Sequence, residues 1–85
     1  MVKFDTIVAL LISKRTQAAT KVQEVLTRHG CIISVRLGLH EAGAVCSDQG
    51  LVLLGVNGTR AAVTALVRDL RKIDGVRVKT MDLTR

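Results

Sequence analysis

The stretch LGLHEAGAVCSDQG, residues 37–50, carries the side chains of this 85-residue chain that are best suited to ligand chemistry. His40 is followed directly by Glu41, and Cys46 comes six positions after the histidine. Imidazole and thiolate bind divalent transition metals such as nickel, zinc or iron. A closed site usually needs four ligands. We therefore weigh two interpretations: a metal site completed by nearby carboxylates and by His29 of a symmetry mate, and a hairpin loop without metal.

A second set of candidates lies on the strand expected at 31–40, CIISVRLGLH. Arg36, Gly38 and His40 share one parity, and the aliphatic residues share the other. If the aliphatic set packs inward, these three residues point away from the helical core. Arg36 is suited to binding a carboxylate or another anion, or to an ion pair between subunits. Gly38 lets a ligand or a second backbone approach closely, and Cys31, on the aliphatic parity, is expected to be buried and inert.

Features of known catalytic sites are scarce in this sequence. It has seven acidic residues, no evident acid/base pair, no glycine-rich phosphate loop and no Cys-x-x-Cys motif. We therefore expect a binding protein and not an enzyme.

The hydrophobic pattern predicts six elements that position these residues. Apolar runs and alternation favour strands, apolar residues at helical spacing favour helices, and Asn57-Gly58-Thr59 is typical of a turn that caps a helix. The expected strands are 4–13, 31–40, 50–58 and 76–83, and the expected helices are 16–30 and 60–73. The order βαββαβ within a single domain, residues 1–85, predicts an α+β ferredoxin-like sandwich. It has a four-stranded antiparallel sheet, both helices on one face, and strands one and three in the centre.

The two central strands are apolar on both parities. In the first, Val8, Leu10 and Ile12 alternate with Ile7 and Leu11. Only one face can pack against the helices, so the other would be a large exposed apolar patch on a monomer. We therefore expect a homo-oligomer, a dimer or a tetramer, formed sheet to sheet or edge to edge.

The net charge of +6 permits an anionic partner. Four cations of the second helical segment could contact phosphates or simply form a solvated face: Arg60, Arg68, Arg71 and Lys72. Phe4 is the only aromatic residue, so the strands lack the stacking platform of single-stranded RNA binders. Nucleic acid is therefore the less favoured partner.

Neither the apolar run at 6–12 nor the two cysteines indicate secretion or a membrane span. The run is far shorter than the ~20 residues that a spanning helix needs. Two cysteines, Cys31 and Cys46, do not make a secreted disulfide framework. We expect a cytoplasmic protein with no membrane association.

Several segments together resemble a known family. The telling pieces are Gly30, RLGLHE (36–41), Cys46, GLVLL (50–54) and IDGVRVK (73–79). They are similar to the small stand-alone regulators of the iron-only hydrogenase system, which are ACT-like domains related to the C-terminal domain of the nickel-responsive repressor. The resemblance implies an oligomer that binds a small effector or metal at a subunit interface.

The resemblance also implies which residues would hold a metal. In the nickel repressor, histidines and a cysteine at the second strand and the following loop bind the ion, and a neighbouring subunit supplies a further histidine. His40, Cys46 and His29 can be mapped onto these positions. Gly38 stands where the family pattern has another histidine, so Glu41 would have to substitute or an organic effector would replace the metal.

The leading hypothesis is thus a ligand-sensing regulator that uses Arg36, Gly38, His40 and Glu41 and passes its signal to a protein partner by contact. The alternative is an assembly module that docks a partner through the edge of the second strand.

Overall fold

The computed structural model describes residues 5–13, 15–40 and 49–84. Their elements follow the order β1, α1, a short 3-10 helix η1, β2, β3, α2 and β4. Their bounds are β1 Thr6–Ile12, α1 Arg15–Arg28, η1 Gly30–Ile32, β2 Ile33–His40, β3 Gly50–Val56, α2 Arg60–Arg71 and β4 Val76–Asp82.

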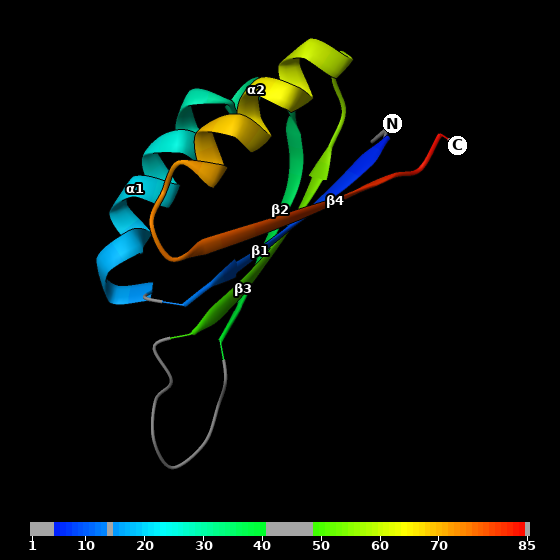
Figure 1. The fold of residues 1–85 in the computed structure, drawn as a ribbon. Coiled ribbons are helices and arrows are strands. Elements are labelled where there is room, and N and C mark those ends of the chain that lie inside the picture. Colours follow the sequence, from blue (N-terminus) through cyan, green and yellow to red (C-terminus); the bar gives the residue numbers. More distant parts are fainter. Residues whose placement is uncertain (1–4, 14, 41–48, 85) are drawn as a thin grey trace.

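The four strands form one antiparallel sheet in the order β2-β3-β1-β4. Both helices cover the same face of this sheet, and the opposite face is left open (Figure 1). The α+β ferredoxin-like prediction is therefore confirmed, with β1 and β3 in the centre and β2 and β4 at the two edges.

The hydrophobic core lies between the helices and the sheet. Val8, Leu10 and Ile12 of β1 are buried, as their alternation predicts. The buried residues of the helices recur at helical spacing, which places one apolar stripe of each helix on the sheet. From the helices these are Ala18, Val22, Val25, Leu26, Leu66, Val67 and Leu70.

The second helix begins at the predicted residue and ends at Arg71, two residues before the predicted end at residue 73. The Thr59 side chain accepts a hydrogen bond from the Ala62 backbone N–H at 3.1 Å, so Thr59 is the N-cap. After the helix, Gly75 has a φ of 82°, a conformation that suits glycine, and the chain turns into β4.

The end of the first helix differs from the prediction. The chain leaves α1 through the 3-10 turn Gly30–Ile32, and β2 starts at Ile33 instead of at Cys31. Gly30 does not have positive φ, since among the described residues only Gly75 does. Because Cys31 lies in this turn and not in a strand, it is exposed; the expectation that it is buried was wrong.

A register shift in β2 reverses which of its residues face the helices. Between Ile33 and Val35 the pairing with β3 is irregular, and Ser34 is the extra residue. An inserted residue moves every later side chain to the opposite face. Val35 and Leu37 therefore lie on the open face, at 46% and 49% exposure.

The same shift corrects the expectation for the polar set of β2. Arg36 and Gly38 pair with Leu54 and Val52 of β3, positions on the helix side of the sheet. They were expected on the opposite side, because an unbroken strand would have buried the aliphatic parity.

The open face of the sheet is largely apolar, as expected. Cross-strand rows run from β2 through β3 and β1 to β4, and only β4 contributes cations to them. The rows are Val35–Gly55–Ile7–Met81, Leu37–Leu53–Ala9–Lys79 and, from β3 to β4, Leu51–Leu11–Arg77. No helix among the described residues is long and apolar enough to cross a membrane.

Candidate functional site

Arg36 lines a small hollow at the outer edge of β2. The hollow measures about 230 Å³ and lies where the end of α1 and η1 approach the strand. We call it the β2 hollow. It is lined by Leu26, Gly30, Ile33, Ser34, Val35 and Arg36. The irregularity at Ser34 thus brings the guanidinium-bearing residue to a concave surface beside the 3-10 turn.

Gly38 and His40 lie further along β2. A Cβ atom built on Gly38 would meet no atom within 4 Å, so this position borders open space. The backbone of His40 pairs with Gly50 at the end of the strand. Glu41 and Cys46 lie outside the described residues. The predicted ligand set therefore stays a prediction.

His29 is held by a carboxylate from the other helix. Its Nε2 lies 2.8 Å from Asp69 Oδ2, and because a carboxylate only accepts, Nε2 donates. Both side chains are largely buried, with 15% and 18% exposure. Arg28 Nη1 also contacts Asp69 Oδ2, at 3.5 Å. The hydrogen bond from His29 lowers the pKa of Asp69, and the positive charges of His29, Arg68 and Lys72 lower it further against the opposing effect of burial.

His29 and His40 lie at opposite ends of β2 in one chain. His29 precedes η1, and the seven residue steps from Ile33 to His40 span about 23 Å of extended strand. Within the part of the chain that the structure describes, no three His, Cys, Asp or Glu residues come close enough to hold a metal. A site that uses both histidines would need two subunits.

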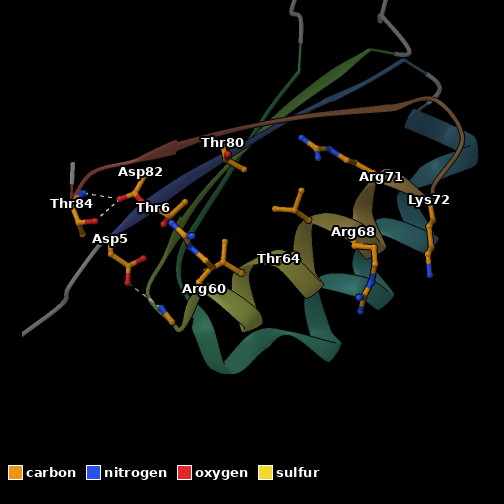
Figure 2. A pocket seen from close by; sticks show the side chains of 13 residues that line it. Asp5, Thr6, Arg60, Thr64, Arg68, Arg71, Lys72, Thr80, Asp82 and Thr84 are labelled. Atoms are coloured by element: carbon orange, nitrogen blue, oxygen red, sulfur yellow. Dashed lines mark hydrogen bonds between the residues drawn. The ribbon is translucent and has the colours of Figure 1, made fainter.

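A concave surface larger than the β2 hollow lies between α2 and the C-terminal part of β4 (Figure 2). Its volume is about 790 Å³, within the range typical of small-molecule sites. We call it the α2–β4 groove. Its lining residues are Asp5, Thr6, Gly58, Arg60, Val63, Thr64, Val67, Arg68, Arg71, Lys72, Thr80, Asp82 and Thr84.

The sequence indicated only the basic residues of this groove and not the residues that face them. The four cations on α2 could be read from the sequence, but their polar neighbours come from segments about 50 residues before and 10 residues after the helix. Thr6 pairs with Asp82 across the β1–β4 ladder, so β1 and β4 place both at the floor of the groove. Only the sheet topology brings these three segments together.

Comparison with known proteins places the chain among regulators. The TM1266-like family model, described as "Iron-only hydrogenase system regulator, putative", matches residues 5–80. The structure of the uncharacterized protein TM1266 from Thermotoga maritima is similar, with 27% identity and a TM-score of 0.80. The match covers 92% of this chain and 94% of that one. Comparison with curated proteins gives no match.

More distant structures agree in fold alone. The nitrogen regulatory PII-like protein CPII from Thiomonas intermedia K12, bound to ADP, AMP and bicarbonate, has 11% identity and a TM-score of 0.61. That match covers 98% of this chain and 96% of CPII. The regulatory subunit of aspartate kinase from Thermus thermophilus has 21% identity and a TM-score of 0.54, with 93% of this chain and 52% of that chain covered. The fold is thus the ACT-like and PII-like form of the ferredoxin-like sandwich.

Proposed function

This chain belongs to the TM1266-like family of iron-only hydrogenase system regulators, and we propose that it regulates without catalysing a reaction. In this proposal it forms a homo-oligomer through the open face of its sheet. A small effector binds beside β2 at the boundary between subunits, and the signal passes to another protein by contact.

The observation that carries this proposal is the opposite orientation of two consecutive residues. Val35 lies on the open face with 46% exposure, and Arg36 pairs with Leu54 on the helix side. Both residues line the β2 hollow. A second copy that covers Val35 and Leu37 would therefore end beside the hollow and the Arg36 guanidinium.

Such an arrangement gives a physical route from binding to signalling. An effector shifts the equilibrium between two subunit arrangements only by the difference in its affinity for them. A ligand held by Arg36 on one side and by the neighbouring subunit on the other satisfies this condition, since it loses its contacts with the neighbouring subunit when the subunits separate. A carboxylate-bearing molecule fits the planar donor set of arginine.

The test combines ligand screening with a measurement of assembly. Thermal unfolding is followed with amino acids and dicarboxylates, and sedimentation velocity then compares the assembly with and without each stabilising compound. We expect at least one carboxylate to raise the unfolding temperature and change the assembly, and Arg36→Gln to abolish both effects. Lys21→Gln, the same loss of charge on the exposed side of α1, serves as the control. An effector response that is unchanged in Arg36→Gln would rule out the proposed site.

The pairing of His29 with Asp69 favours a second candidate, a metal as the effector. A histidine that binds a metal commonly donates its other ring N–H to a carboxylate, and His29 already does so through Nε2. Its Nδ1 would then be the metal-binding nitrogen, with His40 and Cys46 supplied by the neighbouring subunit. The residues described in one chain do not form the site alone, so the metal would also bridge subunits.

Elemental analysis separates the two candidates. Untagged protein is purified anaerobically with reduced thiols and titrated with nickel, zinc and iron(II). Near-stoichiometric metal that is lost in each of His29→Gln, His40→Ala and Cys46→Ser supports the metal site. Metal that is retained in all three variants, or absent from the wild type, leaves the carboxylate effector as the function to pursue.

A further inference from the structure

We propose that the α2–β4 groove is a second binding site, independent of the β2 hollow, for a small phosphate monoester with hydroxyl groups at its far end. Nucleoside monophosphates and sugar phosphates have this chemistry. The groove lies along β4, and the hollow lies along β2, the opposite edge strand. The proposal therefore does not depend on the proposed effector site.

The groove has a basic end that is suited to a phosphate. Arg71 forms this basic end, whereas Arg60, eleven residues earlier on the same side of α2, lies about 16 Å away along the helix axis at the other end. Arg71 Nη2 donates to the Val78 carbonyl oxygen at 3.4 Å, which holds the guanidinium over the edge strand. Figure 2 shows Arg71 extending from α2 toward β4, whereas Arg68 and Lys72 extend away from it. One guanidinium donor is thus used for positioning, and the others remain to bind a dianion bidentately.

The opposite end of the groove carries the carboxylates of Asp5 and Asp82 beside Arg60. The backbone N–H and the hydroxyl of Thr84 both donate to Asp82 Oδ1, at 2.8 and 2.6 Å, so the need for a donor falls on Asp5. Asp82 lies four residues after Val78, about 13 Å along the strand, and Asp5 lies beside the same end. Asp5 Oδ2 accepts from the Gly58 backbone N–H at 3.2 Å. Within the described part of the chain, Asp5 Oδ1 is buried and has no hydrogen-bond partner. A buried acceptor without a donor is costly, so a ligand hydroxyl or amino group would be stabilised there.

The middle of the groove is mixed in character. Val63 and Val67 of α2 line it, together with the hydroxyl-bearing Thr64 and Thr80. Further along β4, the helix-facing position Val78 is buried, whereas Thr80 is exposed, so the sheet changes from apolar to polar at the groove. Such a surface accommodates a sugar ring, which has both apolar and hydroxyl-bearing sides.

The shape of the groove and its carboxylates argue for a small molecule over nucleic acid. A nucleic-acid backbone presents a continuous row of phosphates, which needs cations along its whole path. Here a phosphate row would meet the carboxylates of Asp5 and Asp82 within the same groove. A ligand with its negative charge at one end avoids that repulsion.

The test is a calorimetric titration of the full chain with AMP, ribose 5-phosphate and glucose 6-phosphate. Adenosine, inorganic phosphate and a short DNA duplex serve as comparison ligands. We expect saturable 1:1 binding of at least one monoester with micromolar affinity, and weaker binding of adenosine and of phosphate. Arg71→Gln should lower the affinity for the monoester by about 10-fold or more, since it removes a charge-assisted contact. Arg77→Gln, an equal charge change on the open face, should alter it less than twofold.

Two further variants keep the test decisive if Arg71→Gln unfolds. Thr64→Glu places a negative charge on the exposed groove side of α2 and should abolish monoester binding, whereas Thr27→Glu on α1 should not. Asp5→Asn keeps an acceptor for the Gly58 N–H but removes the carboxylate. It should weaken binding of the monoester and leave the affinity for inorganic phosphate unchanged. Absence of saturable binding by all three monoesters, tighter salt-dependent binding of DNA, or equal affinity in Thr64→Glu would overturn the proposal.

Discussion

His29, which directly follows α1, contacts Asp69 in the last turn of α2: His29 Nε2 lies 2.8 Å from Asp69 Oδ2. The two residues are 40 positions apart in the sequence. Arg28 and Arg68 place further positive charge at the same carboxylate. The contact joins the residue that follows α1 to the last turn of α2, directly before η1 begins at Gly30. A single carboxylate thus links the two helices beside the start of η1.

This contact makes stability sensitive to acid. The pKa of Asp69 lies below its ordinary value of 3.8, chiefly because of the hydrogen bond from His29. A lowered pKa stabilises the folded state above the ordinary value, and this contribution is lost as the pH falls through the folded pKa. We expect Asp69→Asn to unfold at a lower urea concentration than wild type at neutral pH. Between about pH 5 and pH 2, roughly the carboxylate range, its free energy of unfolding should fall by less than that of wild type.

Urea unfolding followed by circular dichroism across that pH range measures the effect. Asp74→Asn, a change at an exposed carboxylate in the turn after α2, is the control and should follow the wild-type pH profile. An Asp69→Asn profile parallel to wild type would show that the pair does not contribute to acid sensitivity.

Gly58 and Gly38 should respond differently to replacement by alanine. At Gly58 a Cβ would lie 2.8 Å from Cγ2 of Ile32, a branched side chain packed against the core. We expect Gly58→Ala to lower the free energy of unfolding by about 1–3 kcal/mol because the helix entry must shift. Gly38→Ala meets no atom within 4 Å and should change it by less than about 0.5 kcal/mol. Chemical denaturation of both variants measures this; equal stabilities would contradict the close approach at Gly58.

Leu37→Lys should disrupt the proposed oligomer and leave the subunit folded. Leu37 is 49% exposed in one subunit, so a lysine there can reach water, but covering it with a second copy would bury a charge. Sedimentation equilibrium should show a smaller species for this variant than for wild type. Gln23→Lys on the exposed side of α1 adds the same charge and should leave the assembly intact. A monomeric wild type would exclude the open face as a self-association surface.

The N-cap of α2 should be measurable on its own. Thr59→Ala removes the acceptor for the Ala62 N–H and should cost about 1 kcal/mol of folding free energy. Thr59→Ser keeps the hydroxyl and should retain most of that folding free energy. Guanidinium denaturation compares the three proteins; a Thr59→Ala variant as stable as wild type would mean that solvent replaces the cap without loss.

Much of the fold follows from patterns that are local in the sequence. The alternation of β1, the apolar stripes of both helices and the turn at Asn57-Gly58-Thr59 are set by neighbouring residues, so they predicted the element order. The double-sided apolar character of β1 and β3 also predicted the open face. These features need no knowledge of distant contacts, because periodicity alone decides which side of an element is buried.

The site depended on geometry that is not local. A single extra residue at Ser34 reversed the faces of β2, and the sequence contains no distinctive signal for it, because aliphatic residues occupy Ile32, Ile33, Val35 and Leu37 in either register. The pairing of His29 with Asp69 likewise required the packing angle of the two helices. Neither could be derived from spacing.

The sequence by itself determined the order of the elements, the apolar open face and the excess of positive charge, because each is a property of residue type and period. Only the tertiary structure decided that Arg36 faces a hollow beside η1 and that Asp5, Arg71 and Thr80 share one groove. The physical reason is that strand register and sheet order, which arise from contacts between distant segments, choose the neighbours of each side chain.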